Sequence, residues 1–137
     1  NNPKPLQQPH PPILIGGAGE KRLLRLVAEH ADIWNCPNNA ALELEHKLEV
    51  LKQHCAAFGR DPATIEVSEQ TIVVLGRTDE DLRSKLQFAK RTLGAVFDID
   101  KTALRGTPEQ LIEAIQARSR QGVTFFTMMF GDLNHTV

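Results

Sequence analysis

The stretch from Pro11 to Asn35 constrains the fold of this chain more than any other part of it. The apolar run 13–15 is too short for a helix and is bounded by prolines and glycines, which is typical of a strand buried on both faces. The glycine-rich stretch 16–19 then turns the backbone, and Glu20 opens a helix with one apolar face. A second apolar run follows at 31–34. This succession predicts a right-handed βαβ unit.

The glycine-rich turn at the start of this helix is suited to binding an anion. Glycines expose the backbone N–H groups, and the positive end of the helix dipole lies at the same place, so a phosphate is the usual ligand. Two sharper motifs are excluded. A dinucleotide fingerprint needs glycine where Arg22 stands, and a P-loop needs Lys followed by Ser or Thr where Glu20 and Lys21 stand. The residues alone leave open a tight turn that binds nothing.

The composition limits the classes of protein to consider. With 137 residues, of which 41% are apolar, the chain has the length of one domain and can bury a core. Its formal net charge of −1, with both signs mixed along the chain, argues against nucleic acid or an anionic membrane as a partner. No apolar run has membrane-spanning length and no signal peptide is visible, so we expect a cytoplasmic protein with free thiols at Cys36 and Cys55. The proline-rich residues 1–12 are predicted to form a connector from an upstream segment.

The rest of the chain alternates helices and strands. The predicted elements are a helix over 40–58, a strand over 65–75, a helix capped by Thr78, a helix capped by Thr107 and a strand over 123–130. Between 94 and 105 the apolar pattern weakens, which predicts a loop or a short turn of helix. Four strands separated by helices predict a parallel α/β sheet. Such a sheet is either half of a TIM (β/α)8 barrel or an open flavodoxin-like sheet.

Three blocks of the sequence carry a resemblance to a known family. They read PPILIGGAGEKRLLRLVAEHADIWN, KLEVLKQHCAAFGRDPATIEVS and GTPEQLIEAIQARSRQGVTFFTMMFG. In this order and at this spacing they resemble the C-terminal half of the bacterial luciferase-like oxidoreductases, which are (β/α)8 barrels. The resemblance implies that residues 13–137 form a parallel (β/α) half-barrel with strands 5 to 8 of the family barrel. It also implies a flavin cofactor, either the deazaflavin coenzyme F420 or FMN.

The same resemblance implies a set of site residues. The loop after the family's fifth strand helps to hold the cofactor phosphate, which corresponds here to Gly16, Gly17, Ala18 and Gly19, with Lys21 or Arg22 as charge partners. Trp34 and Asn35, at the end of the next strand, become candidate pocket residues, with simple packing as the alternative for Trp34. Glu69 or Gln70 could approach the site from the following strand, with a solvated edge as the alternative. No catalytic residue can be named, and no pair of histidines has the spacing of a metal site.

The resemblance implies an oxidoreductase that moves a hydride, or activates oxygen, at a bound F420 or FMN and acts on a small-molecule substrate. Because the first four strands of the barrel are missing from this sequence, the chain alone is expected to be a poor enzyme that anchors the cofactor phosphate. The alternative is a non-catalytic half-barrel that associates with itself. Open half-barrels leave two strand edges unpaired, so we expect a homodimer or pairing with the missing half-barrel.

Overall fold

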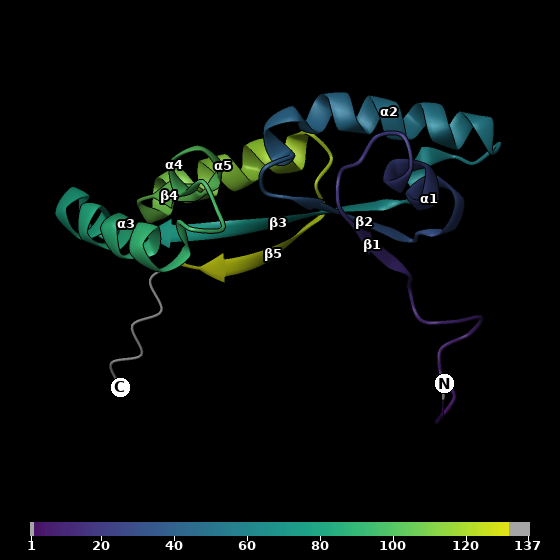
Figure 1. Cartoon of the computed structure of the whole chain (residues 1–137), viewed down its shortest axis with the longest axis horizontal. Coiled ribbons are helices and arrows are strands. Elements are labelled where there is room, and N and C mark those ends of the chain that lie inside the picture. The colour runs from purple at the N-terminus through teal and green to yellow at the C-terminus, as the bar shows by residue number, and fades with distance from the viewer. Residues whose placement is uncertain (1, 132–137) are drawn as a thin grey trace.

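The computed structural model describes residues 2–131 and is built around an open parallel sheet (Figure 1). The strands are β1 (Leu14–Gly16), β2 (Ile33–Pro37), β3 (Glu66–Leu75), β4 (Leu104–Gly106) and β5 (Phe125–Phe130). The α-helices are α1 (Leu23–His30), α2 (Leu44–Ala57), α3 (Asp79–Leu93), α4 (Ile99–Thr102) and α5 (Pro108–Arg120), and the short 3₁₀ helices are η1 (Ala41–Glu43) and η2 (Pro62–Thr64). Residues 2–13 contain neither helix nor strand.

The strand order confirms the half-barrel and excludes the flavodoxin-like alternative. β1 pairs with β2 and β2 pairs with β3, all in parallel, and β5 pairs with β3 over Ser68–Val73. Because β2 and β5 both pair with residues 68–70, they lie on opposite edges of β3. The strands β1, β2, β3 and β5 therefore lie side by side in chain order, as in a barrel, without the reversal of strand order that defines a doubly wound sheet.

The short strand β4 was not predicted from the sequence. It pairs with residues 73–75 of β3, in the segment where the apolar pattern weakens. The predicted short turn of helix in this segment is confirmed by α4, whose Ile99 is buried. Three residues of strand are too few for an alternating pattern to be visible in the sequence.

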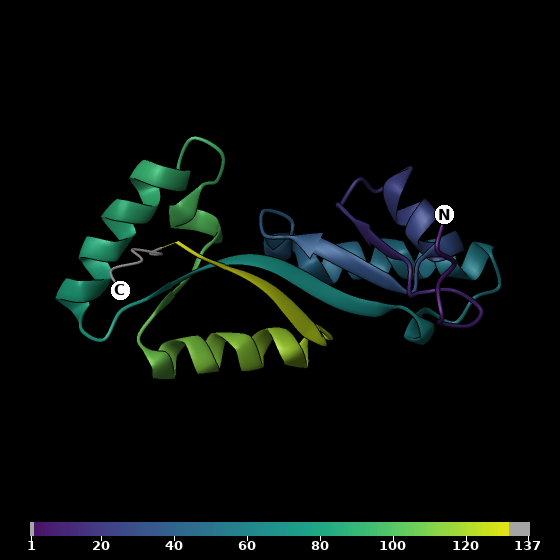
Figure 2. The ribbon, with the colours of Figure 1, turned by 90° about the horizontal axis from the view of Figure 1, so that it is seen from below.

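The two faces of the sheet differ in what covers them. The helix-covered face carries Trp34, Cys36 and Val67, which pack with α1 and α2, and α5 lies on the same side (Figure 1). The opposite face, called here the open face, carries Asn35, Ser68 and Gln70. Figure 2 shows α3 and α4 at the far end of the long strand β3, where they pack on Ile72 and Val74.

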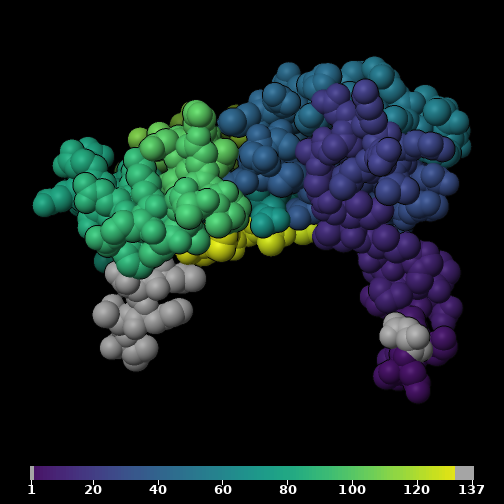
Figure 3. Space-filling view, viewed as in Figure 1, coloured from purple at the N-terminus to yellow at the C-terminus, as the bar shows by residue number. Residues whose placement is uncertain are grey.

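One expectation about β1 is wrong. The run 13–15 was predicted to be buried on both faces, but Leu14 is 48% exposed and Ile13 is 40% exposed. Only Ile15 packs into the core, on the helix-covered face. The reason is that β1 is an edge strand and nothing covers the open face at this point. Figure 3 shows β5 in the same situation, with its atoms lining the underside of the molecule.

The helix boundaries follow the predicted caps more closely than the predicted lengths. Thr78 accepts a hydrogen bond from Asp81 N, and Thr107 forms a reciprocal capping box with Gln110. The helix expected over 40–58 begins only at Leu44, after η1, and ends at Ala57. Both cysteines are free thiols, as predicted, and both are fully buried.

A buried ion pair connects α5 to the sheet. Glu69 is 1% exposed on the helix-covered face, and its Oε2 lies 3.3 Å from Arg118 Nε, without the alignment of a hydrogen bond. Arg118 also donates to the carbonyl oxygen of Ala41, so it joins α5 to η1 as well. Burial raises the pKa of the Glu69 carboxyl, and the charge of Arg118 opposes this only in part. Burial and the Glu69 charge raise the pKa of neighbouring Cys36 to about 12.

The raised pKa of Glu69 makes the stability of the chain depend on pH. Because the folded state holds this proton more tightly than the unfolded state, Glu69 favours folding below the unfolded pKa of 4.5 and loses this contribution as pH rises through the folded pKa. We expect the unfolding free energy of Glu69→Gln, relative to the unaltered chain, to rise with pH above about 4.5. Urea denaturation at several pH values measures it. Glu45→Gln, at an exposed position, is the control, and its unfolding free energy should differ from that of the unaltered chain by the same amount at every pH. If Glu69→Gln also differed by the same amount at every pH, the raised pKa of Glu69 would be contradicted.

Candidate functional site: the glycine turn and the carboxyl ends of β1 and β2

The glycine turn 16–19 is fixed to β2 by two hydrogen bonds. Gly17 N donates to the carbonyl oxygen of Asn35 at 3.1 Å, and the indole Nε1 of Trp34 donates to the carbonyl oxygen of Gly17 at 2.7 Å. Gly17 has φ +124°, and a Cβ there would lie 2.7 Å from Leu23 Cδ1. Glycine is therefore required at position 17 by both backbone and space. At Gly19, by contrast, a Cβ would make only an ordinary contact of 3.6 Å with Leu23 Cβ.

The turn leads into a helix end whose donors are free. Among residues 2–131, the backbone N–H groups of residues 18–23 meet no hydrogen-bond acceptor. The N-cap residue of α1, Arg22, makes no side-chain cap, and the first turn of α1 holds no acidic residue. The helices α3 and α5 differ, because Thr78 and Thr107 cap them. The start of α1 therefore combines free donors with an uncompensated helix dipole, which is the arrangement that binds anions.

The predicted charge partners Lys21 and Arg22 stand beside this turn but are not fixed to it. Both are exposed, and their side chains line a hollow of about 320 Å³ along α1 together with Arg25 and Glu29. Neither side chain makes a hydrogen bond or ion pair within the part of the chain that the structure describes. They add positive charge near the turn, but the position of the turn is fixed by the hydrogen bonds of Gly17 to β2.

Glu20, directly after the turn, is held by α2. Its Oε1 accepts a hydrogen bond of 2.5 Å from Lys47 Nζ and lies 3.2 Å from His46 Nε2. Its carbonyl oxygen accepts from His54 Nε2 at 2.7 Å, which means that this ring nitrogen carries the proton. The hydrogen bond from Lys47 lowers the pKa of Glu20, and the same bond raises the pKa of Lys47, so the pair is charged on both sides. We call Glu20 with Lys47, His46 and His54 the clamp.

A row of polar side chains crosses the open face beside the turn. Gly16, Asn35 and Ser68 are partners in the strand register, so they lie side by side. Ser68 Oγ donates to Asn35 Oδ1 at 2.9 Å, and Asn35 Nδ2 lies 3.5 Å from Gln70 Oε1. The row begins at Gly16, the last residue of β1, and passes through Asn35 in the middle of β2 to Gln70 in the first half of β3. The glycine turn itself follows directly on β1, at the carboxyl end of that strand, which is where parallel α/β folds place their ligands.

The other candidate residues lie away from this row. Trp34 is fully buried on the helix-covered face, where it packs in the core and holds the turn from behind through its indole N–H. Glu69 also faces the helices, so the solvated edge suggested for it is wrong, and only Gln70 of that pair reaches the open face. The difference follows from register, since consecutive residues of a strand point to opposite faces.

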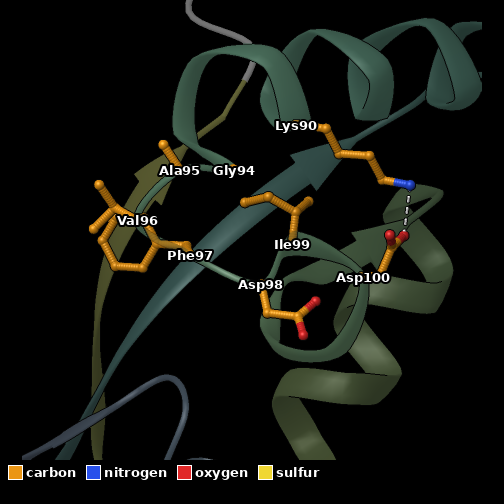
Figure 4. A pocket seen from close by; sticks show the side chains of 8 residues that line it. All are labelled: Lys90, Gly94, Ala95, Val96, Phe97, Asp98, Ile99 and Asp100. Atoms are coloured by element: carbon orange, nitrogen blue, oxygen red, sulfur yellow. Dashed lines mark ion pairs between the residues drawn. The ribbon is translucent and has the colours of Figure 1, made fainter.

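Two cavities lie near the α3–α4 connection. The first, about 210 Å³, is lined by Pro37, Asn38, Gln70, Phe97 and Thr102 among others, and thus extends the polar row toward α4. Asn38, which is buried, donates to Thr102 Oγ1 at 3.0 Å across it. The second, about 460 Å³, lies between the end of α3 and α4 and is bordered by the Lys90–Asp100 ion pair of 2.7 Å (Figure 4). It contains none of the predicted site residues.

Residues 2–131 contain neither a candidate metal site nor a candidate membrane span. No group of three or more His, Cys, Asp or Glu side chains in the described chain could hold a metal ion. No helix within residues 2–131 is both long and apolar enough to span a bilayer.

The clamp residues were missed by sequence reasoning, although one of them left a signal. Lys47 lies three residues after Leu44 and four before Leu51, both of which are buried. A lysine within the apolar stripe of a helix indicates a buried charge with a partner. The helical spacing of residues 40–58 places His46 and His54 away from the apolar stripe, and nothing in the sequence indicates that this side of the helix meets Glu20.

Comparison with solved structures gives the fold of the chain. An F420-dependent secondary alcohol dehydrogenase in complex with an F420–acetone adduct matches with a TM-score of 0.69 and 16% identity, over 90% of this chain and 44% of that one. The long-chain alkane monooxygenase LadA matches with a TM-score of 0.70 and 18% identity, over 93% of this chain and 38% of that one. The FMN-bound oxygenating constituent of 3,6-diketocamphane monooxygenase from Pseudomonas putida matches with a TM-score of 0.63 and 16% identity, over 87% of this chain and 42% of that one. The chain thus spans less than half the length of these enzymes.

The sequence itself gives the family. Among curated proteins, no relative was found by sequence. A sequence model of the luciferase-like monooxygenases, however, matches residues 1–96, which is more than half of the chain and includes the glycine turn, β2 and all of the clamp. The chain therefore belongs to the luciferase-like monooxygenase family.

Proposed function

We propose that this chain is the C-terminal part of a luciferase-like oxidoreductase and that its glycine turn anchors the phosphate of a bound F420 or FMN. The observation that carries the proposal is the run of free N–H groups over residues 18–23, at an uncapped helix N-terminus and beside the carboxyl ends of β1 and β2. Family membership supports the flavin class, because solved structures of the same fold include an F420-dependent and an FMN-bound enzyme. Either cofactor carries a phosphate that such donors can bind.

The donor set fits a phosphate and not a cation. Main-chain N–H groups can only donate, and Lys21 and Arg22 stand at the rim of the turn. The one nearby carboxylate, Glu20, is neutralised by Lys47 and so does not repel an anion. When bound, the flavin supplies the hydride or oxygen chemistry. This chain's own contribution is to orient the cofactor through the turn and to form one polar wall with Asn35 and Gln70, where the hydroxyl of the buried Ser68 orients Asn35.

The remaining wall of the site is proposed to come from the other barrel half. The chain covers less than half of the enzymes with the same fold, and its open face is uncovered beside the polar row. We therefore expect the chain alone to bind phosphate-bearing ligands weakly and to be inactive as an oxidoreductase. The small-molecule substrate is proposed to enter near the cavity of about 210 Å³ that adjoins Gln70.

Substitution of Gly19 tests the phosphate assignment. Gly19→Asp places a carboxylate among the free donors, where the backbone tolerates a side chain, and should weaken binding of FMN at least about tenfold, or about 1.4 kcal/mol. Gly19→Asn has the same shape without the charge and should bind nearly as the unaltered chain does. The fluorescence of Trp34, the single tryptophan, provides the readout because its indole contacts Gly17.

The choice of position 19 matters to this test. Gly17→Asp would also remove the site, but a side chain at φ +124° and 2.7 Å from Leu23 would distort the turn whatever its charge. Titrations with FMN, F420 and inorganic phosphate should give the same ranking of variants. Equal affinities for Gly19→Asp and Gly19→Asn, in a chain that binds FMN, would exclude a phosphate at this turn.

The open face and the outer edges of β1 and β5 are proposed to be an association surface. Leu14 is 48% exposed on β1 and Phe130 is 43% exposed on β5. The outer edge of each of these strands has no pairing partner within the described residues. Unpaired strand edges next to exposed apolar side chains favour pairing with another sheet. In a whole barrel the other half satisfies them, and in the isolated chain a second copy can do so.

Self-association of the isolated chain is therefore a testable consequence. We expect light scattering to give twice the mass of the chain at micromolar concentration. Leu14→Glu, which places a charge on the open face of β1, should shift the population to monomer, whereas Leu42→Glu, at an exposed position on η1, should not. A monodisperse monomer of the unaltered chain would contradict self-association.

A further inference from the structure

The clamp between Glu20 and α2 poses a physical question that the proposed function leaves open. A carboxylate stands one residue after the glycine turn, within the run of free N–H groups at residues 18–23. A free Glu20 side chain could fold back onto these donors, as acidic residues do when they cap helices. It would then compete with a phosphate for the same N–H groups and repel it.

Lys47 prevents this competition by its position. Lys47 is only 9% exposed and lies on the buried side of α2. Its Nζ nevertheless lies 2.5 Å from Glu20 Oε1 and 3.6 Å from Glu43 Oε2. A buried ammonium group needs such partners, because an unpaired charge in this environment is costly. The carboxylate of Glu20 is therefore drawn toward α2 and away from the donors of the turn. His46, at 3.2 Å from the same oxygen, adds a second contact on the exposed side.

His54 acts on the backbone of the same residue. Its Nε2 donates to the Glu20 carbonyl oxygen at 2.7 Å, and the ring is half-buried against the turn. In a trans peptide the C=O and the following N–H point in opposite directions. Holding the Glu20 carbonyl toward α2 therefore directs the N–H of Lys21 away from α2, so that this donor stays available at the start of α1.

We propose that Lys47 and His54 are positioning residues of the phosphate site, which keep the Glu20 carboxylate off the donors and hold the turn open for an anion. The inference rests on the proposed function and adds residues from a helix distant in sequence. The clamp is electrostatic at Glu20 and Lys47, and geometric at His54. Neither Lys47 nor His54 needs to touch the ligand, since each acts through Glu20.

A double-mutant cycle tests the electrostatic part. Lys47→Met should weaken binding of FMN and of inorganic phosphate about tenfold, because the released carboxylate competes for the donors. Adding Glu20→Gln to Lys47→Met should restore the affinity to within about twofold. Glu20→Gln alone should bind as well as the unaltered chain or more tightly. Lys52→Met removes a charge from the exposed side of α2 and should leave affinity unchanged.

The rescue distinguishes positioning from a merely structural role. If Lys47 only stabilised α2, Lys47→Met would lower the urea midpoint and the second substitution would not restore ligand affinity. That result, or unchanged affinity in a folded Lys47→Met, would overturn the inference while leaving the phosphate site in place. Failure of the unaltered chain to bind FMN, F420 or phosphate would overturn the proposed function and this inference with it.

A pair of histidine variants tests the proposal independently, even if Lys47→Met does not fold. His54→Phe preserves a ring of similar size but loses the donor to the Glu20 carbonyl, and should weaken phosphate binding while Trp34 remains buried by its emission wavelength. His30→Phe, at an exposed residue that makes no contact with the turn, is the matched control and should bind normally. Equal binding by the two histidine variants would overturn the geometric part of the proposal.

Discussion

The attachment of the glycine turn to β2 is the constraint on which the rest of the site depends. Gly17 donates its N–H to the backbone of Asn35 and accepts from the indole of Trp34 through its carbonyl, so both main-chain polar groups of this residue are satisfied by β2. Only a residue without a side chain can take φ +124° against Leu23. Because the turn is fixed in this way, the free N–H groups that follow it have a defined place beside the carboxyl end of β2.

The two faces of the sheet have different neighbours, and β3 presents different side chains to each. Its first half presents Val67 and Glu69 to the helices and Ser68 and Gln70 to the opposite face, where Gln70 is exposed and Ser68 is buried beneath its neighbours. Its second half turns Ile72 and Val74 toward α3 and α4, which pack on the same side as the open face but farther along. The position of the polar row relative to α3 and α4 is therefore set by β3, which contacts both. This places Phe97 and Thr102 at the rim of the cavity that adjoins Gln70.

Sequence reasoning recovers those parts of the molecule that depend on local chemistry. The strand–turn–helix unit, the Thr78 and Thr107 caps and the order of the main strands all follow from residue type and spacing. It fails where the cause is distant in the chain. The exposure of Leu14 depends on a missing covering layer, and the burial of Glu69 depends on Arg118, nearly fifty residues later by the printed numbering. The clamp is the same case, because His46, Lys47 and His54 lie 26 to 34 residues after Glu20.

The parts of the proposed phosphate anchor divide by how firmly they are held. The main-chain donors, the Trp34 contact and the clamp all lie within this half of the barrel and are fixed by hydrogen bonds. Lys21 and Arg22 are exposed, so they add charge without geometry. An anchor of fixed dipoles loses little entropy on binding, whereas mobile cations attract an anion from a distance. Under the proposed function, one barrel half is therefore expected to bind the phosphate end of a flavin, while the ring and the substrate are expected to need a wall from the other half.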